Sequence, residues 1–385
     1  MNSQYGTNSL KIAVTGAQGL LGWHTCGRLH SQICAAKFKQ EKPPIDLVQI
    51  DREAFEDGDT LAGMVADVDA IIHFAGVNRG EESFVEKANP EISDQLISAC
   101  RSAKSHPHII YANSTHAESD TFYGRSKRIA GEKLAQYGER YTDIVLPHIF
   151  GECALPNYNN VTATLIDNIW NNKKPQINPD GRVQLLHAGD AADIAIQAAM
   201  QNTYGELRPK GYEISIQDLY DRIARFHELY RNNIFPDVSD AFDLNLFNSY
   251  RTAGYPAHYP FNPKVNQDSR GILFESAKGG NSAQSFLSTT HPGVVRGDHF
   301  HLNLVERFLV VKGDAIIRIR RILTNDTNEF HVSGDVPAAI DMPPLHTHHI
   351  ENVGDDDVIT FFWSHHIFDP TNPDTYADPV FERVT

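Results

Sequence analysis

The sequence predicts two folded units, an α/β unit with a doubly wound parallel sheet followed by an all-β unit. Apolar strands alternate with helical stretches up to about residue 250, which is typical of parallel sheets. Prolines and aromatic residues interrupt this pattern over residues 255–263, as at a junction between domains. Short strands at close spacing follow, which indicates an antiparallel barrel or sandwich. We therefore place the first domain at residues 1–250, a linker at 251–263 and the second domain at 264–385.

Composition and charge argue against several classes of protein. The chain is 41% hydrophobic and 22% charged, and no apolar run approaches the roughly 18 residues of a membrane span. A net charge of −15 argues against binding to nucleic acid or to an anionic membrane. The four cysteines show no paired spacing, which suits reduced thiols. Residues 1–8 lack a basic start and an apolar core, so we expect no export signal and a cytoplasmic protein.

The first element is a strand that ends in a glycine-rich turn and leads into a helix. Three glycines, Gly16, Gly19 and Gly22, follow the apolar run at three-residue intervals. Glycines at such positions permit a tight turn, a close approach to a pyrophosphate and close packing of helix on strand, while the helix N-terminus attracts the anion. The alternative is an ordinary glycine-rich turn, because the spacing differs from the usual dinucleotide fingerprint.

The next two strands carry the expected contacts of the cofactor. The strand at 46–51 ends at Asp51-Arg52, where a carboxylate favours a ribose 2′-hydroxyl and an arginine accommodates a 2′-phosphate. We expect NADP(H), with NAD(H) as the alternative if Arg52 is simply solvated. The apolar strand at 68–76 ends in small residues, and we expect the cofactor to lie close to Ala75.

The first catalytic candidates follow the strand at 108–114. Tyr123 and Lys127 are four residues apart at the start of a helical stretch, hence on one face. A nearby ammonium would favour the phenolate and let Tyr123 exchange a proton near neutral pH. Ser114, at the end of the strand, can bind the same substrate oxygen. Such a pair is common by chance, but here it supplies the proton half of a hydride transfer.

With these motifs, residues 10–245 resemble the nucleotide-sugar branch of the extended short-chain dehydrogenase/reductase (SDR) family, whose sheet is Rossmann-like. The resemblance implies that Tyr123 is the acid/base, that Lys127 modulates it and contacts the ribose, and that Ser114 binds the carbonyl, with Thr115 as a possible substitute. His148 stands where many relatives have asparagine.

The second constellation lies in the all-β part. His299 and His301 share one side of a strand because the side-chain period is two, and Glu306 lies on the next strand across a short bend. His348 offers a fourth ligand. Three imidazoles and a carboxylate suit Zn²⁺, Fe²⁺, Mn²⁺ or Ni²⁺. The alternative is a set of solvated surface histidines.

This pattern resembles the cupin family, whose metal lies inside a jelly-roll barrel. Leu345 departs from the glycine usual in the second cupin motif. From the resemblance we expect one divalent metal, with zinc as the first choice. Whether the metal is catalytic or structural stays open.

Nearly the whole chain resembles bifunctional capsular polysaccharide synthesis enzymes, in which an extended SDR is fused to a cupin. The segments that carry this resemblance are 75–79, 156–160, 268–271, 291–293, 306–311 and 368–376. It implies that the cupin epimerises C3 of a UDP-4-keto-6-deoxy-N-acetylhexosamine. The SDR domain then reduces the C4 ketone with NADPH to a UDP-N-acetyl-L-talosamine-type product for capsule or O-antigen synthesis. A homodimer is expected by the same resemblance.

Two other functions fit the residues. One is a nucleotide-sugar 4-epimerase or dehydratase with tightly bound NAD. The other leaves the cupin without turnover of its own, as a sugar-binding or oligomerisation module. On each reading the partner is a nucleotide sugar, with no nucleic acid and no membrane insertion.

Overall fold

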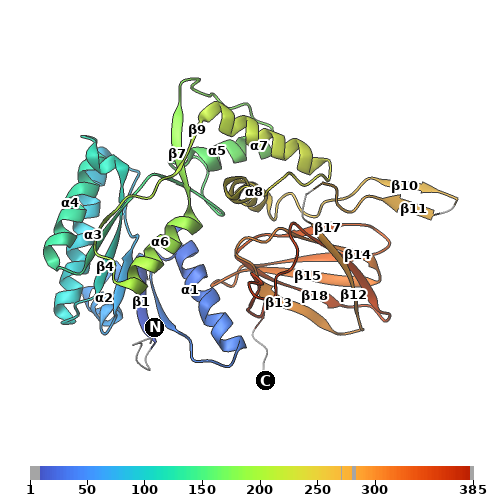
Figure 1. Cartoon of the computed structure of the whole chain (residues 1–385), viewed down its shortest axis with the longest axis horizontal. Coiled ribbons are helices and arrows are strands. Elements are labelled where there is room, and N and C mark those ends of the chain that lie inside the picture. The colour runs from blue at the N-terminus through green and yellow to red at the C-terminus, as the bar shows by residue number, and fades with distance from the viewer. Residues whose placement is uncertain (1–8, 270, 280–282, 382–385) are drawn as a thin grey trace. The chain divides into compact units, whose positions relative to one another are not determined.

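The computed structural model describes residues 9–269, 271–279 and 283–381 (Figure 1). Residues 1–8, which we expect to carry no export signal, lie outside the described residues. The chain forms two compact units, Met1–Val161 with Arg182–Ile214, and Thr162–Gly181 with Ser215–Thr385. The domain boundaries that we placed at residues 250 and 264 stay a prediction. Within the described residues, no helix combines the length and apolar character needed to cross a membrane.

The first unit is built on a six-stranded sheet in which every pair of neighbouring strands is parallel. Continuous buried runs such as Ala70–His73 form its central strands, as expected for a sheet covered on both faces. In spatial order the strands are β2 (Ile45–Ile50), β1 (Leu10–Thr15), β3 (Ala70–His73), β4 (His108–Ser114), β5 (Tyr141–Leu146) and β8 (Gly205–Leu207).

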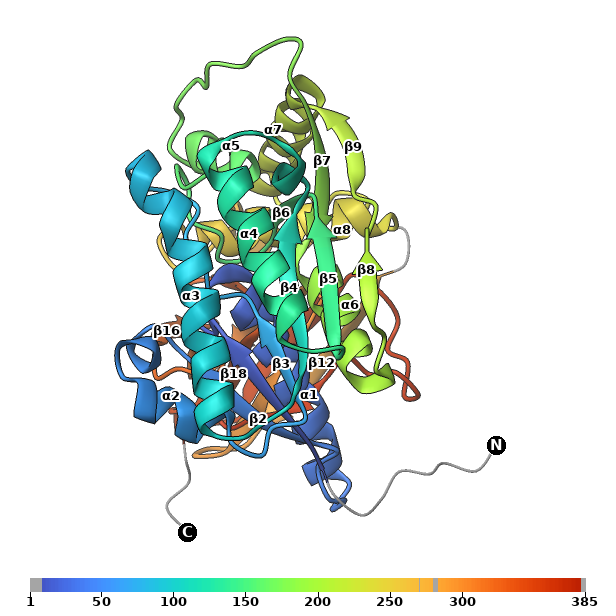
Figure 2. The same ribbon diagram turned by 90° about the vertical axis from the view of Figure 1, so that its left-hand side faces the viewer.

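Helices cover both faces of this sheet. Helices α3 and α4 pack side by side with α2 on one face, and α1 packs with α6 on the other (Figures 1 and 2). The predicted doubly wound α/β fold is therefore confirmed for this unit. The helices are α1 (Leu20–Phe38), α2 (Gly58–Val65), α3 (Glu82–Ser102), α4 (Phe122–Tyr137) and α6 (Ala188–Gln201), with short 3-10 turns η1 (Glu53–Glu56) and η2 (Thr115–Glu118).

The sheet order fixes where a ligand can bind. From β1 the chain goes to β2 on one side and then to β3 on the other, so the order reverses at β1 and β3. In open parallel sheets ligands bind in the crevice beyond the carboxyl ends of the strands at such a switch point. Gly16 directly follows β1, and Ala75 is the second residue after β3.

A small second sheet was not predicted from the sequence. It consists of β6 (His148–Phe150), β7 (Arg182–His187) and β9 (Tyr212–Ser215). Helix α6 follows β7 directly, and its N-cap is His187. Nδ1 of His187 accepts the amide of Gly189, so an imidazole caps the first turn of this helix.

The second unit contains two antiparallel sheets that enclose an apolar core, including Phe308, Ile317, Ile340, Ile350 and Phe362. The predicted jelly-roll cupin fold is confirmed. One sheet has the order β12 (Gln284–Thr290), β19 (Val358–Ser364), β14 (Glu306–Lys312) and β17 (Ala339–Met342), and the other β16 (Thr327–Ser333), β15 (Asp314–Arg321), β18 (His346–Asn352), β13 (Val295–Phe300) and β20 (Tyr376–Ala377). A separate hairpin joins β10 (Val265–Asp268) to β11 (Gly271–Phe274).

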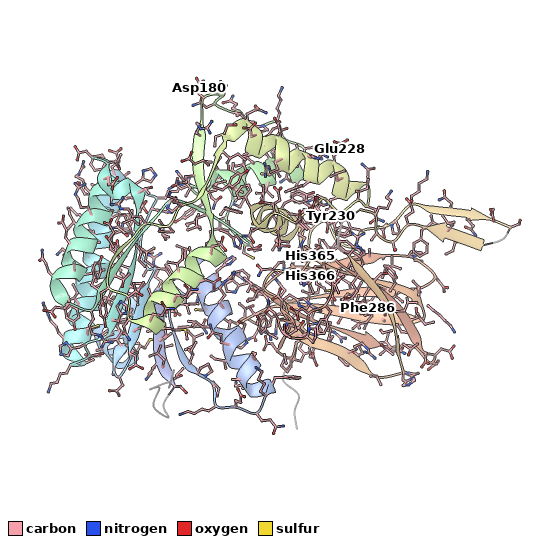
Figure 3. The ribbon with its side chains drawn as sticks, viewed as in Figure 1. Asp180, Glu228, Tyr230, Phe286, His365 and His366 are labelled. Carbon is pink, nitrogen blue, oxygen red and sulfur yellow. The ribbon has the colours of Figure 1, made fainter. Side chains whose placement is uncertain are left out.

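Among the described residues, this unit also contains the helices α5 (Val161–Trp170), α7 (Ile216–Arg231) and α8 (Ala241–Gly254). The unit begins at Thr162, the second residue of α5. Tyr230 of α7, labelled in Figure 3, donates a hydrogen bond to Asp341 of β17. Helix α8 crosses the domain boundary that we predicted at residue 250. Every residue from 245 to 252 is buried, and a helix buried all round shows no amphipathic period.

Candidate active site and metal centre

The turn after β1 needs its glycines for steric reasons. Gly16 has a φ of +65°, and a Cβ there would lie 2.9 Å from the backbone nitrogen of Ala75. A Cβ on Gly22 would lie 2.0 Å from the carbonyl oxygen of Gly16. Side chains at these positions would push β3 and α1 away from the turn, so the glycines keep the carboxyl edge of the sheet compact.

The N-terminus of α1 has the chemistry that a phosphate requires. Its N-cap, Gly19, offers no side chain to the first amides, and the first turn contains no acidic residue. Unsatisfied helix amides and the helix dipole together favour an anion. The residues present therefore fit the pyrophosphate of a dinucleotide at the switch point.

Asp51 and Arg52, at the end of β2, have different surroundings. Oδ1 of Asp51 accepts the amide of Ala54 and so begins the 3-10 turn η1. The Arg52 side chain is exposed and makes no hydrogen bond or ion pair with any described residue. Asp51 is thus used by the fold, while the guanidinium of Arg52 is available to a ligand.

The structure brings Tyr123, Ser114 and Lys127 to the end of β4, where each has its own contacts. Burial raises the pKa of Tyr123, and its hydrogen bond with Ser114 lowers that pKa by less. Nζ of Lys127 donates to the carbonyl oxygen of Ala112 at 2.6 Å and lies 4.0 Å from the ring centre of Tyr111. The buried ammonium is thus bound by a backbone carbonyl oxygen, while the phenol has its hydrogen bond with Ser114.

Lys127 is itself unusual. Burial lowers its pKa to about 7, although Asp143 opposes the shift. A buried ammonium with such a pKa loses its proton far more readily than a surface lysine. A negative group beside it would raise the pKa again, so the charge of Lys127 depends on what binds there.

Two histidines beside Tyr123 were not predicted as site residues. The ring of His116 lies 6.2 Å from that of Tyr123 and 5.5 Å from that of His148, measured between ring centres. His116 belongs to η2, directly after Ser114, and His148 begins β6. The substitution of His148 for the asparagine of many relatives was the one signal in the sequence that pointed here.

In the barrel the structure brings His299, His301, Glu306 and His348 together, with one potential ligand atom from each within 4.8 Å of the others. Oε2 of Glu306 lies 3.3 Å from Nε2 of His301 and 3.6 Å from Nε2 of His348. His299 and His348 come from the neighbouring strands β13 and β18, where they are paired directly. Leu345 has a φ of +58°, which lies in the left-handed region that glycine favours.

Backbone carbonyls orient these imidazoles. Nδ1 of His301 donates to the carbonyl oxygen of Asp374 at 2.6 Å, and Nδ1 of His348 donates to that of His346 at 3.2 Å. His299 is held by a hydrogen bond with the backbone of Gly297. Metal-binding histidines are usually fixed in this way through the nitrogen that does not bind the metal.

One ring nitrogen of the cluster has no hydrogen-bond partner. Nε2 of His348 is buried and has no hydrogen-bond partner among the described residues. A buried polar atom left in this state is costly unless something binds it. Three oriented imidazoles and one buried carboxylate are a donor set that suits zinc, so these residues fit the expected metal.

The electrostatics of the cluster favour a cation. Burial lowers the pKa of His299 to about 3, which keeps that imidazole neutral. Burial acts to lower the pKa of His301, but Glu306 outweighs it and raises the pKa. The pKa of Glu306 is held low by His301 and His348 in spite of its burial. The cluster therefore keeps a carboxylate among imidazoles at neutral pH.

The loop between His301 and Glu306 is fixed by a residue that the sequence did not single out. The Asp374 carboxylate accepts the amides of Leu302, Asn303 and Leu304 at 2.8, 2.9 and 3.0 Å. A cavity of about 240 Å³ opens beside the cluster. Its walls include Gln284, Phe286, Ser364, His366, Phe368 and Thr375.

The fold and the switch-point site define a class of protein. Residues 12–214 match the model of the NAD dependent epimerase/dehydratase family, and residues 266–376 match that of the polysaccharide biosynthesis C-terminal domain. The chain belongs to the NAD dependent epimerase/dehydratase family, which implies a nicotinamide cofactor.

Similarity to individual proteins extends over both units. The chain is 32% identical, over 97% of its length and all of the relative, to a UDP-2-acetamido-2,6-beta-L-arabino-hexul-4-ose reductase of Pseudomonas aeruginosa. The capsular polysaccharide assembling protein CapF from Staphylococcus aureus is 26% identical, with a TM-score of 0.56 over 96% of this chain and 100% of that one. CapF with the inhibitor 3-isopropenyl-tropolone matches over the same shares, with 26% identity and a TM-score of 0.54. The predicted likeness to fused SDR–cupin enzymes of capsule synthesis is confirmed.

Proposed function

We propose that the chain converts a UDP-4-keto-6-deoxy-N-acetylhexosamine in two steps. The cupin unit inverts C3, and the SDR unit reduces the C4 ketone with NADPH to a UDP-N-acetyl-L-talosamine-type product. The observation that carries this proposal is that one chain holds a tyrosine–serine pair at a nucleotide-binding edge and a three-histidine, one-carboxylate cluster beside a cavity. Full-length similarity to a reductase named for a UDP-linked hexul-4-ose supports the substrate class.

The two steps are linked by the ketone. A carbonyl at C4 acidifies the C–H bond at C3, so that a base can remove the proton and a new proton can enter from the other face. The inversion stays reversible while the ketone persists. Reduction at C4 converts the ketone to an alcohol and fixes the new configuration.

In the SDR unit, Ser114 and Tyr123 would bind the C4 oxygen and Tyr123 would give it a proton. The nicotinamide, when bound, supplies the hydride to C4. Lys127 would be charged beside the resulting phenolate and would stabilise it. Gly16, Gly19, Gly22 and Ala75 would lie along the cofactor. The exposed guanidinium of Arg52 favours a 2′-phosphate, hence NADPH over NADH.

In the cupin unit, His299, His301, Glu306 and His348 would hold one zinc ion. Zinc, when bound, stabilises negative charge on a carbonyl oxygen. The cavity beside the four residues gives the sugar ring a place next to them. We further propose that the enzyme acts in the cytoplasm as a homodimer and serves capsule or O-antigen synthesis.

The test is to incubate the purified, zinc-loaded chain with the UDP-4-keto sugar and NADPH, and to follow C3 and C4 by NMR. One NADPH should be consumed per sugar, with inversion at C3 and an alcohol at C4. Tyr123→Phe should lower NADPH oxidation by about 100-fold or more. Turnover without net use of NADPH would instead support a 4-epimerase with tightly bound NAD. Reduction without inversion at C3 would leave the cupin as a binding or oligomerisation module.

A further inference from the structure

The cavity beside the metal cluster contains one imidazole that is not among the four proposed zinc ligands, that of His366. We propose that His366 is the base that removes the C3 proton of the sugar. This inference rests on the proposed epimerase function and adds the residue that carries its proton transfer.

The position of His366 follows from strand pairing. Ser364, the last residue of β19, is paired with Glu306 of β14 on one side and with Gln284 of β12 on the other. Directly paired residues project from the same face of a sheet, so Ser364 faces the cavity with Glu306. His366 follows two residues later, and its side chain also reaches the cavity wall. The Ser364 hydroxyl donates to the carbonyl oxygen of His366 at 3.0 Å and holds this turn.

The neighbouring histidine has a different task. Nδ1 of His365 accepts the amide of Val305 at 3.1 Å, and the His365 amide donates to the Val305 carbonyl oxygen. His365 therefore ties the end of β19 to the residue that precedes Glu306. Figure 3 labels both histidines, together with Phe286 of β12, on the barrel. Only His366 of the two lines the cavity.

The other cavity residues are poor bases. Apart from the proposed ligands, the polar side chains of the wall are Gln284, Ser364 and Thr375, and the remainder are apolar. An amide and two hydroxyls accept a proton weakly near neutral pH, whereas an imidazole is suited to it. Oε1 of Gln284 already accepts the amide of Phe368. Among the described residues of this cavity, His366 is thus the group with suitable chemistry.

Proton removal and proton delivery take place on opposite faces of C3. A ring nitrogen of His366 takes the proton from C3, and the C–H electron pair forms the C3–C4 double bond of the enolate. A water molecule in the cavity then gives a proton to the opposite face of C3, and the imidazolium releases its proton to solvent. The sugar gains and loses one proton, so C3 is inverted and its hydrogen comes from water.

The experiment compares the full-length, zinc-loaded wild type with His366→Gln, His366→Glu and the control His331→Gln. His331 is an exposed barrel histidine paired with Glu329. The UDP-4-keto sugar is supplied in D2O without NADPH, and deuterium at C3 is followed by NMR. Zinc content and oxidation of the C4 alcohol product by NADP⁺ are measured on each variant, because neither depends on removal of the C3 proton.

His366→Gln should lose C3 exchange by about 100-fold or more while it keeps its zinc and the NADP⁺ reaction. His366→Glu, which restores a base, should regain part of the exchange, and His331→Gln should match the wild type. Exchange within a few-fold of wild type in His366→Gln, or loss of zinc from that variant, would overturn the assignment. Absence of exchange in the wild type would instead overturn the epimerase function on which it rests.

Discussion

At the scale of single residues, the orientation of the proposed zinc ligands depends on a residue about seventy positions away in the chain. Asp374 binds His301 through its carbonyl oxygen and the 302–304 amides through its carboxylate. The ligand types and their spacing could be predicted from the sequence because strands impose a period of two on side chains. The role of Asp374 could not be predicted, because a carboxylate that caps a loop has no local motif that distinguishes it from a solvated aspartate.

Asp374→Asn should weaken zinc binding by about 10- to 100-fold, the range typical of residues that support metal ligands. The amide keeps the size of the side chain but has only one oxygen for three backbone donors. Zinc affinity is measured by competition with a chromophoric chelator. Asp369→Asn, an exposed aspartate of the same loop that accepts the amide of Thr371, is the matched control and should bind zinc like the wild type. Equal affinities in the two variants would show that the carboxylate does not support the site.

The Tyr123 site shows a different limit of sequence reasoning. A spacing of four residues correctly predicts that Tyr123 and Lys127 share a helix face, on α4. It says nothing of the acceptors that surround a buried ammonium, and the Ala112 carbonyl from the adjacent strand binds it. Which group an ammonium contacts is decided by tertiary packing and not by helical period.

At the scale of elements, a buried polar cluster joins α1, the loop after β6 and the end of β7. Oε2 of Glu152 lies 2.9 Å from Nε2 of His187 and 3.5 Å from Nε2 of His24. Because Nδ1 of His187 accepts the Gly189 amide, the proton of that ring is on Nε2 and is donated to Glu152. This tautomer does not suit a metal at Nε2, so the cluster is a structural link between the three elements.

This cluster predicts loss of stability in acid. Burial lowers the pKa of His24 to about 3, and the contacts with His187 lower that of Glu152 to about 2 in spite of its burial. Both groups therefore bind protons more readily in the unfolded chain. Stability should fall as pH drops below about 6.5 for His24 and below about 4.5 for Glu152, their ordinary values.

The measurement is urea unfolding at several pH values, followed by the fluorescence of Trp23, whose ring lies 5.5 Å from that of His24. Trp170→Phe and Trp363→Phe remove the other tryptophan signals. In that background His24→Asn should flatten the decline between pH 6.5 and 5, and His106→Asn, at an exposed histidine of the same unit, should not. An unchanged slope in His24→Asn would contradict the assignment.

Helix α8 illustrates why the boundary of the second unit was hard to predict. Arg251, fully buried, donates to the carbonyl oxygens of Leu304 at 2.9 Å and Met342 at 2.5 Å, and Asn248 donates to that of Asn303. The helix thus binds the loop that leads to Glu306. Its polar residues face the barrel and not water, so the sequence shows neither an amphipathic stripe nor a reason to join it to the barrel.

Arg251→Met should destabilise the second unit by about 3 kcal/mol and weaken zinc binding, because two buried carbonyl oxygens lose their donor. Thermal unfolding with and without zinc measures the first effect, and chelator competition the second. Arg231→Met, at an exposed arginine in the last turn of α7, is the matched control. If both variants behaved like the wild type, α8 would have no part in holding the metal loop.

At the scale of the whole molecule, the two fold classes were predictable because the alternation of elements changes near residue 260. The exchange of segments between the two compact units has no such signal. After residue 161 the chain enters the second unit with Thr162–Gly181 and then returns to the first unit with Arg182–Ile214. Such an exchange of segments leaves no change in composition, since each helix and strand is ordinary by itself. Tertiary contacts alone decide to which unit each helix or strand belongs.

In the proposed function, one chain inverts C3 and then reduces C4 of the same sugar. The most direct measurement is NMR of the product formed from the UDP-4-keto sugar and unlabelled NADPH in D2O. The product should carry deuterium at C3, from solvent, and protium at C4, from NADPH. A reduced product that retains its original hydrogen and configuration at C3 would contradict it.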